Sequence, residues 1–492
     1  MRSTALLAVL AACVSAQEAL NLPMNRFSSG EVMDSILAEK QATWDSYEAQ
    51  GYFSLGRWKS ANKYSACTHG YAKVANISYA CNNLDVHGYL SHDDLGSRHP
   101  EATRIGSSIW GVTVDGREYV AIGQSDGAAF AEIVGKGWWN YVPFFGKAAG
   151  TLDYLGRVNV PEGSVPAIWK EIKSIHHYAI IGSEAVGHGI QLFDLKKLHA
   201  LRKNPLSTQS KIFEATSHFT DLPVGRSHNV LSSPSSNTIL AVGAQPRTDV
   251  CLGGFIFIDA SDPLDLKRTG KCANLDGYVH DAQCLIYHGP DTKYEGKEIC
   301  YAYNENSMAI FDITDKSNSY IISNTTYPGA SYTHQGWVLD ENNQDFLLMD
   351  DEKDEQNLSE SASDGHATTL IWNITSLENP IHTGDYRSSV KSIDHNQYIT
   401  KGFSYQSNYM AGLRILDVSS VPKDPSGKGI KEVAYFDVFP EDDDEPRTEF
   451  MGSWANTGGW FKSGFVAINT YDRGVFVVKR KAKVGGGYRA EF

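Results

Sequence analysis

Several catalytic signatures are missing from this chain of 492 residues. It has no HExxH metalloprotease motif, no Walker A loop, and no dinucleotide fingerprint that follows a strand and opens a helix. Its one GxSxG match, at residues 123–127, precedes another strand-like run, AAFAEI, where a nucleophile elbow requires a helix. We therefore assign this motif to a turn between strands and exclude these familiar enzyme classes.

An excess of positive charge is also missing, because the formal net charge is −14. Like charge disfavours a nucleic acid or an anionic membrane surface as partner. Beyond the N-terminus, no stretch approaches the roughly 20 apolar residues of a membrane span. Residues 1–16, MRSTALLAVLAACVSA, combine one Arg, a short apolar run and a small-residue cleavage site, which predicts a signal peptide. We therefore expect a secreted, extracellular protein without a membrane span.

Cysteine is scarce, with seven residues, and Cys13 falls within the expected signal peptide. The remaining six have no CxxC spacing of the kind that a tetrahedral zinc site uses. An even number suits disulfide bonds in an oxidising compartment, although six cysteines allow 15 pairings. Local spacing suggests the pairs Cys67 with Cys81, Cys251 with Cys272, and Cys284 with Cys300.

Glycosylation sequons are present, as expected for a secreted protein. The candidate sites are Asn76, Asn324 and Asn357. A fourth sequon, at Asn373, falls at a turn position of the repeats described below, where the side chain is expected to bond to the backbone.

The N-terminal extension, residues 17–66, contains one helical pattern. Its apolar positions Val32, Met33, Ile36 and Leu37 follow helical spacing after Ser29, which predicts an amphipathic helix. We expect this helix to be an appendage. Residues 67–106 form a compact segment, braced by Cys67 and Cys81, with a strand-like run at residues 86–90.

From residue 107 the chain repeats itself. Each repeat opens with an aromatic residue or His in a similar frame, at intervals of 52 to 61 residues: Trp110, Trp169, His228, His280, His334, His395 and Trp454. A second landmark is a strand that ends in an acid or its amide, at Glu132, Asp194, Asp259, Asp312, Asn373 and Asp417, with Lys479 as the deviant last member. These side chains are expected to make turn bonds to the backbone.

Four strand-like runs in each of seven repeats predict an all-β fold, a seven-bladed β-propeller of four-stranded blades spanning residues 107–481. The seventh repeat lacks an outer strand, because residues 482–492 read as a flexible basic tail. We expect the N-terminal strand at residues 86–90 to fill that place and close the ring.

The strand signature GLRILDVSS, with its relatives MAIFDITD and GIQLFDL, resembles the LVIVD propeller repeat. The order of the cysteine segment, SSIWG, HDAQC, YTHQGW and DHNQY is similar to that of the choice-of-anchor B family of secreted proteins. The resemblance covers roughly residues 67–479. It implies an extracellular propeller with no firmly assigned reaction. Many bacterial relatives carry a C-terminal anchor domain, which this chain lacks, so we expect a soluble secreted form.

Two sets of residues are expected at one mouth of the propeller channel. The first is the column of Trp and His that opens the repeats. The second consists of carboxylates after the second strand: Glu184, Glu305, Asp350, Asp351 and Glu352. Imidazole and carboxylate together could hold a divalent cation, either Ca²⁺ or a first-row transition metal, with His228, His280, His334 and His395 as nitrogen ligands. Alternatively, the column supplies bulky groups whose N–H bonds satisfy the neighbouring blade.

Two functions remain open at this point. The first is an extracellular binding protein, expected to be a monomer, whose partner is a protein, a peptide or a glycan. The second is a metal-dependent hydrolase or lyase, in which a bound cation activates water at the channel mouth. The fold alone does not choose between them, because propellers host many functions.

Overall fold

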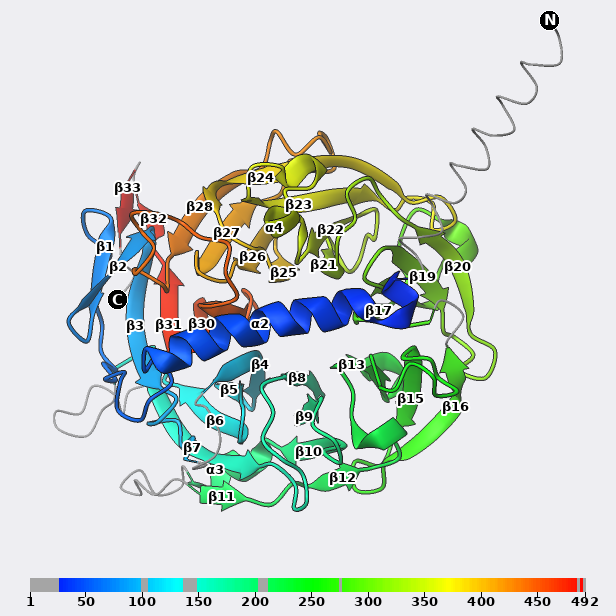
Figure 1. Cartoon of the computed structure of the whole chain (residues 1–492), viewed down its shortest axis with the longest axis horizontal. Helices are drawn as coiled ribbons and strands as arrows, with labels where there is room; N and C mark the ends of the chain where they lie inside the picture. The colour runs from blue at the N-terminus through cyan, green and yellow to red at the C-terminus, as the bar shows by residue number, and fades with distance from the viewer. Residues whose placement is uncertain are drawn as a thin grey trace, which may run out of the picture.

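The computed structural model describes residues 26–98, 105–135, 148–201, 211–273, 277–484 and 487–489. Seven sheets of four to six strands surround a central axis (Figure 1). This is the seven-bladed β-propeller of four-stranded blades that the repeats predicted, and it contains few helices. The expected signal peptide lies outside the described residues. In the ranges given above, no helix combines the length and apolar character needed to cross a bilayer.

Blades 1 to 3 are antiparallel sheets whose first strand lines the channel. Blade 1 contains β4 (Gly106–Val114), β5 (Arg117–Gln124), β6 (Gly127–Ile133) and β7 (Leu152–Asn159). Blade 2 contains β8 (Lys170–Ile175), β9 (Tyr178–Ser183), β10 (Ile190–Asp194) and β12 (Ser217–Phe219). Blade 3 contains β13 (Asn229–Ser233), β14 (Thr238–Val242), β15 (Phe255–Asp259) and β16 (Lys267–Ala273). A short strand, β11 (Lys211–Phe213), adds in parallel to β7.

Blades 4 to 6 repeat this plan. Blade 4 contains β17 (Asp281–Ile286), β18 (Glu298–Tyr303), β19 (Met308–Asp312) and β20 (Tyr320–Thr325). Blade 5 contains β21 (Thr333–Val338), β22 (Phe346–Asp351), β23 (His366–Asn373) and β24 (Ile381–Lys391). Blade 6 contains β25 (Asn396–Thr400), β26 (Phe403–Ser407), β27 (Leu413–Asp417) and β28 (Lys431–Phe436). Short helices α3 (Lys196–Leu201) and α4 (Asp354–Asn357) follow β10 and β22.

Blade 7 combines the two ends of the described chain. It contains β29 (Ser453–Asn456), β30 (Phe465–Thr470), β31 (Gly474–Arg480) and, as its outer strand, β3 (Leu84–Ser91), which pairs antiparallel with β31. The preceding hairpin, β1 (Tyr71–Val74) and β2 (Ile77–Asn82), extends blade 6 through β28. The N-terminal segment therefore joins the outer edges of blades 6 and 7.

Residues 482–492 were expected to form a flexible basic tail. In the structure two short strands, β32 (Ala482–Val484) and β33 (Gly487–Arg489), pair with each other there. Each of these strands has only three residues, which is shorter than the runs of about four to eight residues that identify a strand from sequence.

The acid column forms the turn bonds that were expected of it. In five blades the side-chain oxygen accepts the backbone N–H two residues later, at Asp194, Asp259, Asp312, Asn373 and Asp417. Glu132 differs, because its longer side chain pairs with Arg117 instead. The GxSxG motif likewise lies in the turn between β5 and β6, with no helix after it.

Three disulfide bonds join the neighbouring cysteines: Cys67 with Cys81, Cys251 with Cys272, and Cys284 with Cys300. Cys284 and Cys300 face each other across β17 and β18. Cys67 and Cys81 brace the hairpin that leads into the closing strand.

The helix α2 (Glu31–Ala49) lies across the centre of the propeller (Figure 1). Its buried stripe contains Met33, Ile36, Lys40, Trp44 and Tyr47, and the apolar members belong to the same core as blades 6 and 7. The expectation of an appendage was therefore wrong: the stripe matches the channel mouth, and α2 covers it.

Candidate functional site

Four imidazoles form a continuous row beneath α2. His228, His280 and His395 directly precede the first strands of blades 3, 4 and 6, and His334 is the second residue of β21 in blade 5. Successive ring centroids are 4.2, 4.4 and 4.4 Å apart. The structure thus brings together the four histidines that the repeats placed in one column.

Each imidazole of the row uses its Nδ1 atom to contact an acceptor. The acceptors are Glu184 Oε1 for His228, the His334 carbonyl for His280, Asp350 Oδ1 for His334, and the Trp454 carbonyl for His395. Because carbonyl and carboxylate oxygens only accept hydrogen bonds, Nδ1 carries the proton and Nε2 keeps its lone pair in the neutral ring. This is the arrangement by which outer carboxylates and carbonyls orient histidine ligands of metals.

Burial keeps three of the imidazoles, those of His280, His334 and His395, neutral. It lowers the pKa of His280 and His334 well below the usual value, and it lowers the pKa of His395 to about 4. The ammonium of Lys40 lowers the pKa of the same three groups further. Neutral Nε2 atoms are the form in which histidine binds a metal.

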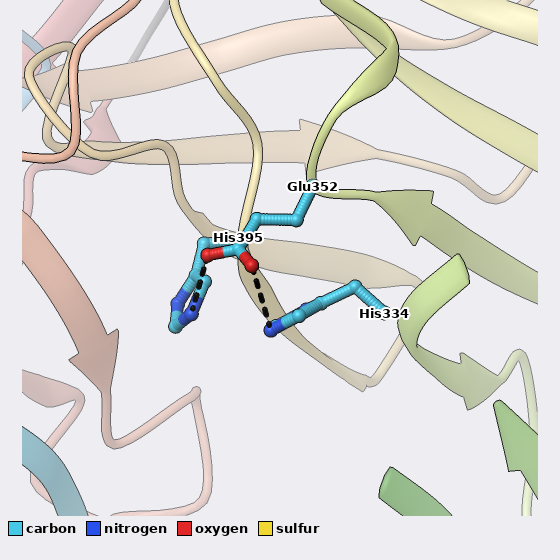
Figure 2. A group of neighbouring side chains, drawn as sticks. All are labelled: His334, Glu352 and His395. Carbon is cyan, nitrogen blue, oxygen red and sulfur yellow. Dashed lines mark ion pairs between the residues drawn. The ribbon is translucent and has the colours of Figure 1, made fainter. Parts of the chain in front are cut away.

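Glu352 supplies the carboxylate of the site (Figure 2). Its Oε1 lies 3.5 Å from His395 Nε2, and its Oε2 lies 3.9 Å from His334 Nε2. One ligand atom from each of these three buried residues lies within 4.8 Å of the others. Burial alone would raise the pKa of Glu352, but the ammonium of Lys40 and the imidazole of His395 lower it below the usual value. The carboxylate is therefore ionised.

Lys40 of α2 is the residue that sequence reasoning missed. Its Nζ lies 2.6 Å from Glu352 Oε1, and the residue is 4% exposed. Tyr409 also donates its hydroxyl to Glu352 Oε1. The sequence did contain a signal for this pair. Lys40 lies in the apolar stripe of α2 between Ile36 and Trp44, and a charged residue is rarely buried in such a stripe unless it forms an ion pair.

The remaining carboxylate candidates divide into three kinds. Asp350 orients His334, as described above. Glu305 forms an ion pair with Arg247, at 2.6 Å, instead of joining an imidazole as a ligand. Asp351 accepts bonds from the Tyr327 hydroxyl and from the backbone N–H groups of residues 331 and 332, so its oxygens serve the structure of blade 5.

The aromatic candidates separate into two places. The ring centroid of Trp454 lies 5.1 Å from that of His395. Trp169 continues the row, with its ring centroid 6.5 Å from that of Trp454 and 5.3 Å from that of Trp44 in α2. Trp110 was expected in this column and is not in it. Its ring packs on Tyr398 and Trp460, at 5.4 and 4.9 Å.

The error at Trp110 has a simple cause. The first strand of blade 1 begins at Gly106, so Trp110 lies four residues into that strand, whereas Trp169 precedes β8. The sequence similarity of SSIWG to PAIWK aligned the two Trp residues, although they occupy different positions relative to the first strand of their blades.

The imidazole–carboxylate site is closed off from solvent. His280, His334 and His395 are 3 to 4% exposed and Glu352 is 1% exposed. Trp44 of α2 donates its indole N–H to the Phe450 carbonyl, and Tyr47 bonds to Glu449, so the helix is fixed at the rim. The side chains of His334, Glu352 and His395 could hold a cation, and α2 lies between them and the solvent on this face of the propeller.

Comparison with known proteins found distant likenesses among solved structures. No family model and no curated protein matches the chain. Three solved structures illustrate the distant likeness, each at 11% sequence identity. A computationally designed protein, Ika8, has a TM-score of 0.43 and covers 85% of this chain and 97% of its own.

The second structure is a functionally unknown protein from Desulfotomaculum acetoxidans, with a TM-score of 0.39, covering 68% of this chain and 90% of its own. The third is the β-propeller domain of Cps50 (Swd1) from Myceliophteria thermophila, with a TM-score of 0.40, covering 74% and 94%. At these scores the comparisons support no conclusion about function.

Proposed function

We propose that this protein is a secreted β-propeller of the LVIVD type that acts as an extracellular binding protein, and that its channel mouth binds one divalent first-row metal ion. The proposal of a metal site rests on the tautomers of the four imidazoles. Because each Nδ1 contacts an acceptor, the Nε2 lone pairs are left for a ligand, and Glu352 lies beside two of them.

Imidazole nitrogen with one carboxylate favours Zn²⁺, Co²⁺, Ni²⁺ or Cu²⁺ over Ca²⁺, which prefers a full set of oxygens. His334, His395 and Glu352 would be the ligands. Glu184 and Asp350, which contact the Nδ1 atoms of His228 and His334, would orient the rings.

With α2 docked, as in the structure, binding is favoured over hydrolysis or lyase chemistry. A metal-bound water could act as a nucleophile only on a substrate that reaches it. In this docked state the helix covers the site, so the partner of this protein, whether a protein, a peptide or a glycan, would contact the outer surface of the blades. The three disulfide bonds support an extracellular location.

Metal titration of the chelator-treated full chain tests this proposal. We expect one equivalent of Co²⁺ to produce visible absorption bands of a nitrogen-ligated ion, and Zn²⁺ to displace it. The variant His334→Ala with His395→Ala should lose this binding, and Asp350→Asn should weaken it about 10- to 100-fold. His69→Ala, on an exposed loop, serves as the matched control. Failure of wild-type protein to bind either ion would end the proposal.

A further inference from the structure

The imidazole–carboxylate site already contains a cation, and the chain itself supplies it. The ammonium of Lys40 contacts Glu352 and lies 4.9 Å from the centre of the Phe450 ring. Tyr409 completes the surroundings of the same carboxylate oxygen. Glu352 is thus both the ligand proposed for the metal and the partner of the N-terminal helix.

Two cations cannot share this site at low cost. The Lys40 ammonium, 2.6 Å from Glu352 Oε1, already balances the charge of this carboxylate. Adding a divalent ion beside the ammonium would place like charges within a few ångströms of each other in a buried region. Repulsion at such distances is strong where water is excluded.

Lys40 cannot withdraw alone while α2 stays in place. It lies between Ile36 and Trp44 in a stripe whose members are 2 to 5% exposed. An ammonium that left Glu352 under a closed helix would remain buried without a counter-charge, which is unfavourable. Release of the side chain therefore requires at least part of α2 to lift from the channel mouth.

We infer that a divalent metal ion and the Lys40 ammonium compete for Glu352, so that metal binding at the channel mouth loosens α2 and docking of α2 expels the metal. The inference rests on the proposed function, since it concerns the regulation of the same site. By thermodynamic linkage, whatever stabilises the docked helix weakens metal affinity by the same factor. The position of α2 at the protein surface would therefore depend on whether the site holds a metal ion.

The affinity of Lys40→Met for Co²⁺ and Zn²⁺ is the first test, measured by optical titration of the full chain. The variant removes the competing charge, so we expect it to bind at least tenfold more tightly than wild type. Lys423→Met is the matched control, because Lys423 is an exposed lysine in the loop between β27 and β28 and belongs neither to α2 nor to the imidazole–carboxylate site. Its affinity should stay within about twofold of wild type.

Hydrogen exchange of α2 is the second test, and it needs only the wild-type chain. We expect saturating Zn²⁺ to accelerate exchange of the amides in residues 31–49. This measurement decides the matter even if Lys40→Met fails to fold.

The outcomes separate the two proposals. One contrary result is that a folded Lys40→Met binds the metal no more tightly than wild type; the other is that metal binding leaves the exchange protection of α2 unchanged. Either result would show that the metal and the ammonium bind side by side. It would overturn the inference but leave the proposed metal site intact. Absence of binding by both proteins would overturn the proposed function and this inference with it.

Discussion

Nζ of Lys40 and Oε1 of Glu352 lie 2.6 Å apart although 312 residues separate them in the chain. Both side chains are at most 5% exposed. This pair joins the N-terminal helix to blade 5, and the stability of the protein should depend on it.

Removing one partner of the pair should destabilise the metal-free protein. Lys40→Met leaves the Glu352 carboxylate buried without its cation, and we expect the free energy of unfolding to fall by about 3 to 5 kcal/mol. The double variant with Glu352→Gln removes both charges and should recover part of this loss. Urea denaturation in the presence of a chelator measures both. A loss below about 1 kcal/mol in the single variant would contradict the prediction.

The free energy of unfolding should fall at acidic pH because of His92, which lies next to the closing strand β3. Burial, opposed by bonding to the Thr470 carbonyl, lowers the pKa of this imidazole from 6.5 to about 4. Between these values the unfolded chain binds more protons than the folded one, so stability rises with pH across this window and is fully present above about pH 6.5. The contribution lost on acidification is about 3 kcal/mol.

His92→Gln should remove this contribution to the pH dependence. The measurement is the free energy of unfolding at several pH values from 4 to 7, compared between wild type and variant. His69→Gln, an exposed change, should keep the wild-type slope. Parallel curves for wild type and His92→Gln would refute the assignment.

The closing strand β3 should be sensitive to loss of one aromatic side chain. Tyr89 is 2% exposed, stacks on Phe476 at 4.4 Å and bonds to the Arg473 carbonyl. We expect Tyr89→Ala to cost about 3 to 5 kcal/mol, as for other large buried aromatics. Tyr71→Ala in β1, at a position 53% exposed, should change stability little. Thermal and urea unfolding of the two variants provide the comparison.

The disulfide between Cys67 and Cys81 should stabilise the same region. It closes a short loop, with 14 residues of sequence separation, and chain entropy predicts a contribution of about 3 kcal/mol. The double Cys→Ser variant should lose this amount in denaturant unfolding. Reduction of wild-type protein should cost at least as much, because it opens all three bonds.

Glycan occupancy should follow the role of each Asn side chain. Asn76, Asn324 and Asn357 are exposed, whereas Asn373 accepts bonds from the backbone N–H and hydroxyl of Thr375. In a eukaryotic secretory host we expect glycans at the first three positions and none at Asn373. Peptide mass spectrometry after enzymatic deglycosylation in water labelled with a heavy oxygen isotope detects the occupied sites. A glycan at Asn373 would contradict the turn assignment.

Repetition explains how much of the fold was predictable from sequence. Each blade repeats the same frame, so His228, His280, His334 and His395 could be aligned without knowing any contact. Errors arose where local likeness and strand register disagree. The residues around Trp110 resemble those around Trp169, but the position of Trp110 along β4 places its ring in a different part of the channel.

The cation of the site was hidden for a different reason. Lys40 lies outside the repeats, and its partner is fixed only by how α2 crosses the ring. No periodicity connects residue 40 to residue 352. A single charged residue within an apolar stripe was the available signal, and it identifies a buried pair without naming the partner.

The shared seventh blade has a consequence for biosynthesis. Tyr89 and Arg473, which meet at the closing strand, are 384 residues apart. At a synthesis rate of roughly 5 to 20 residues per second, β3 must wait roughly 20 to 80 seconds for its neighbour β31 to emerge. During that interval β3 has been made but its partner β31 has not, so the ring can close only after nearly the whole chain has emerged from the ribosome. Chaperones that shield exposed strand edges would therefore act on the N-terminal segment longest.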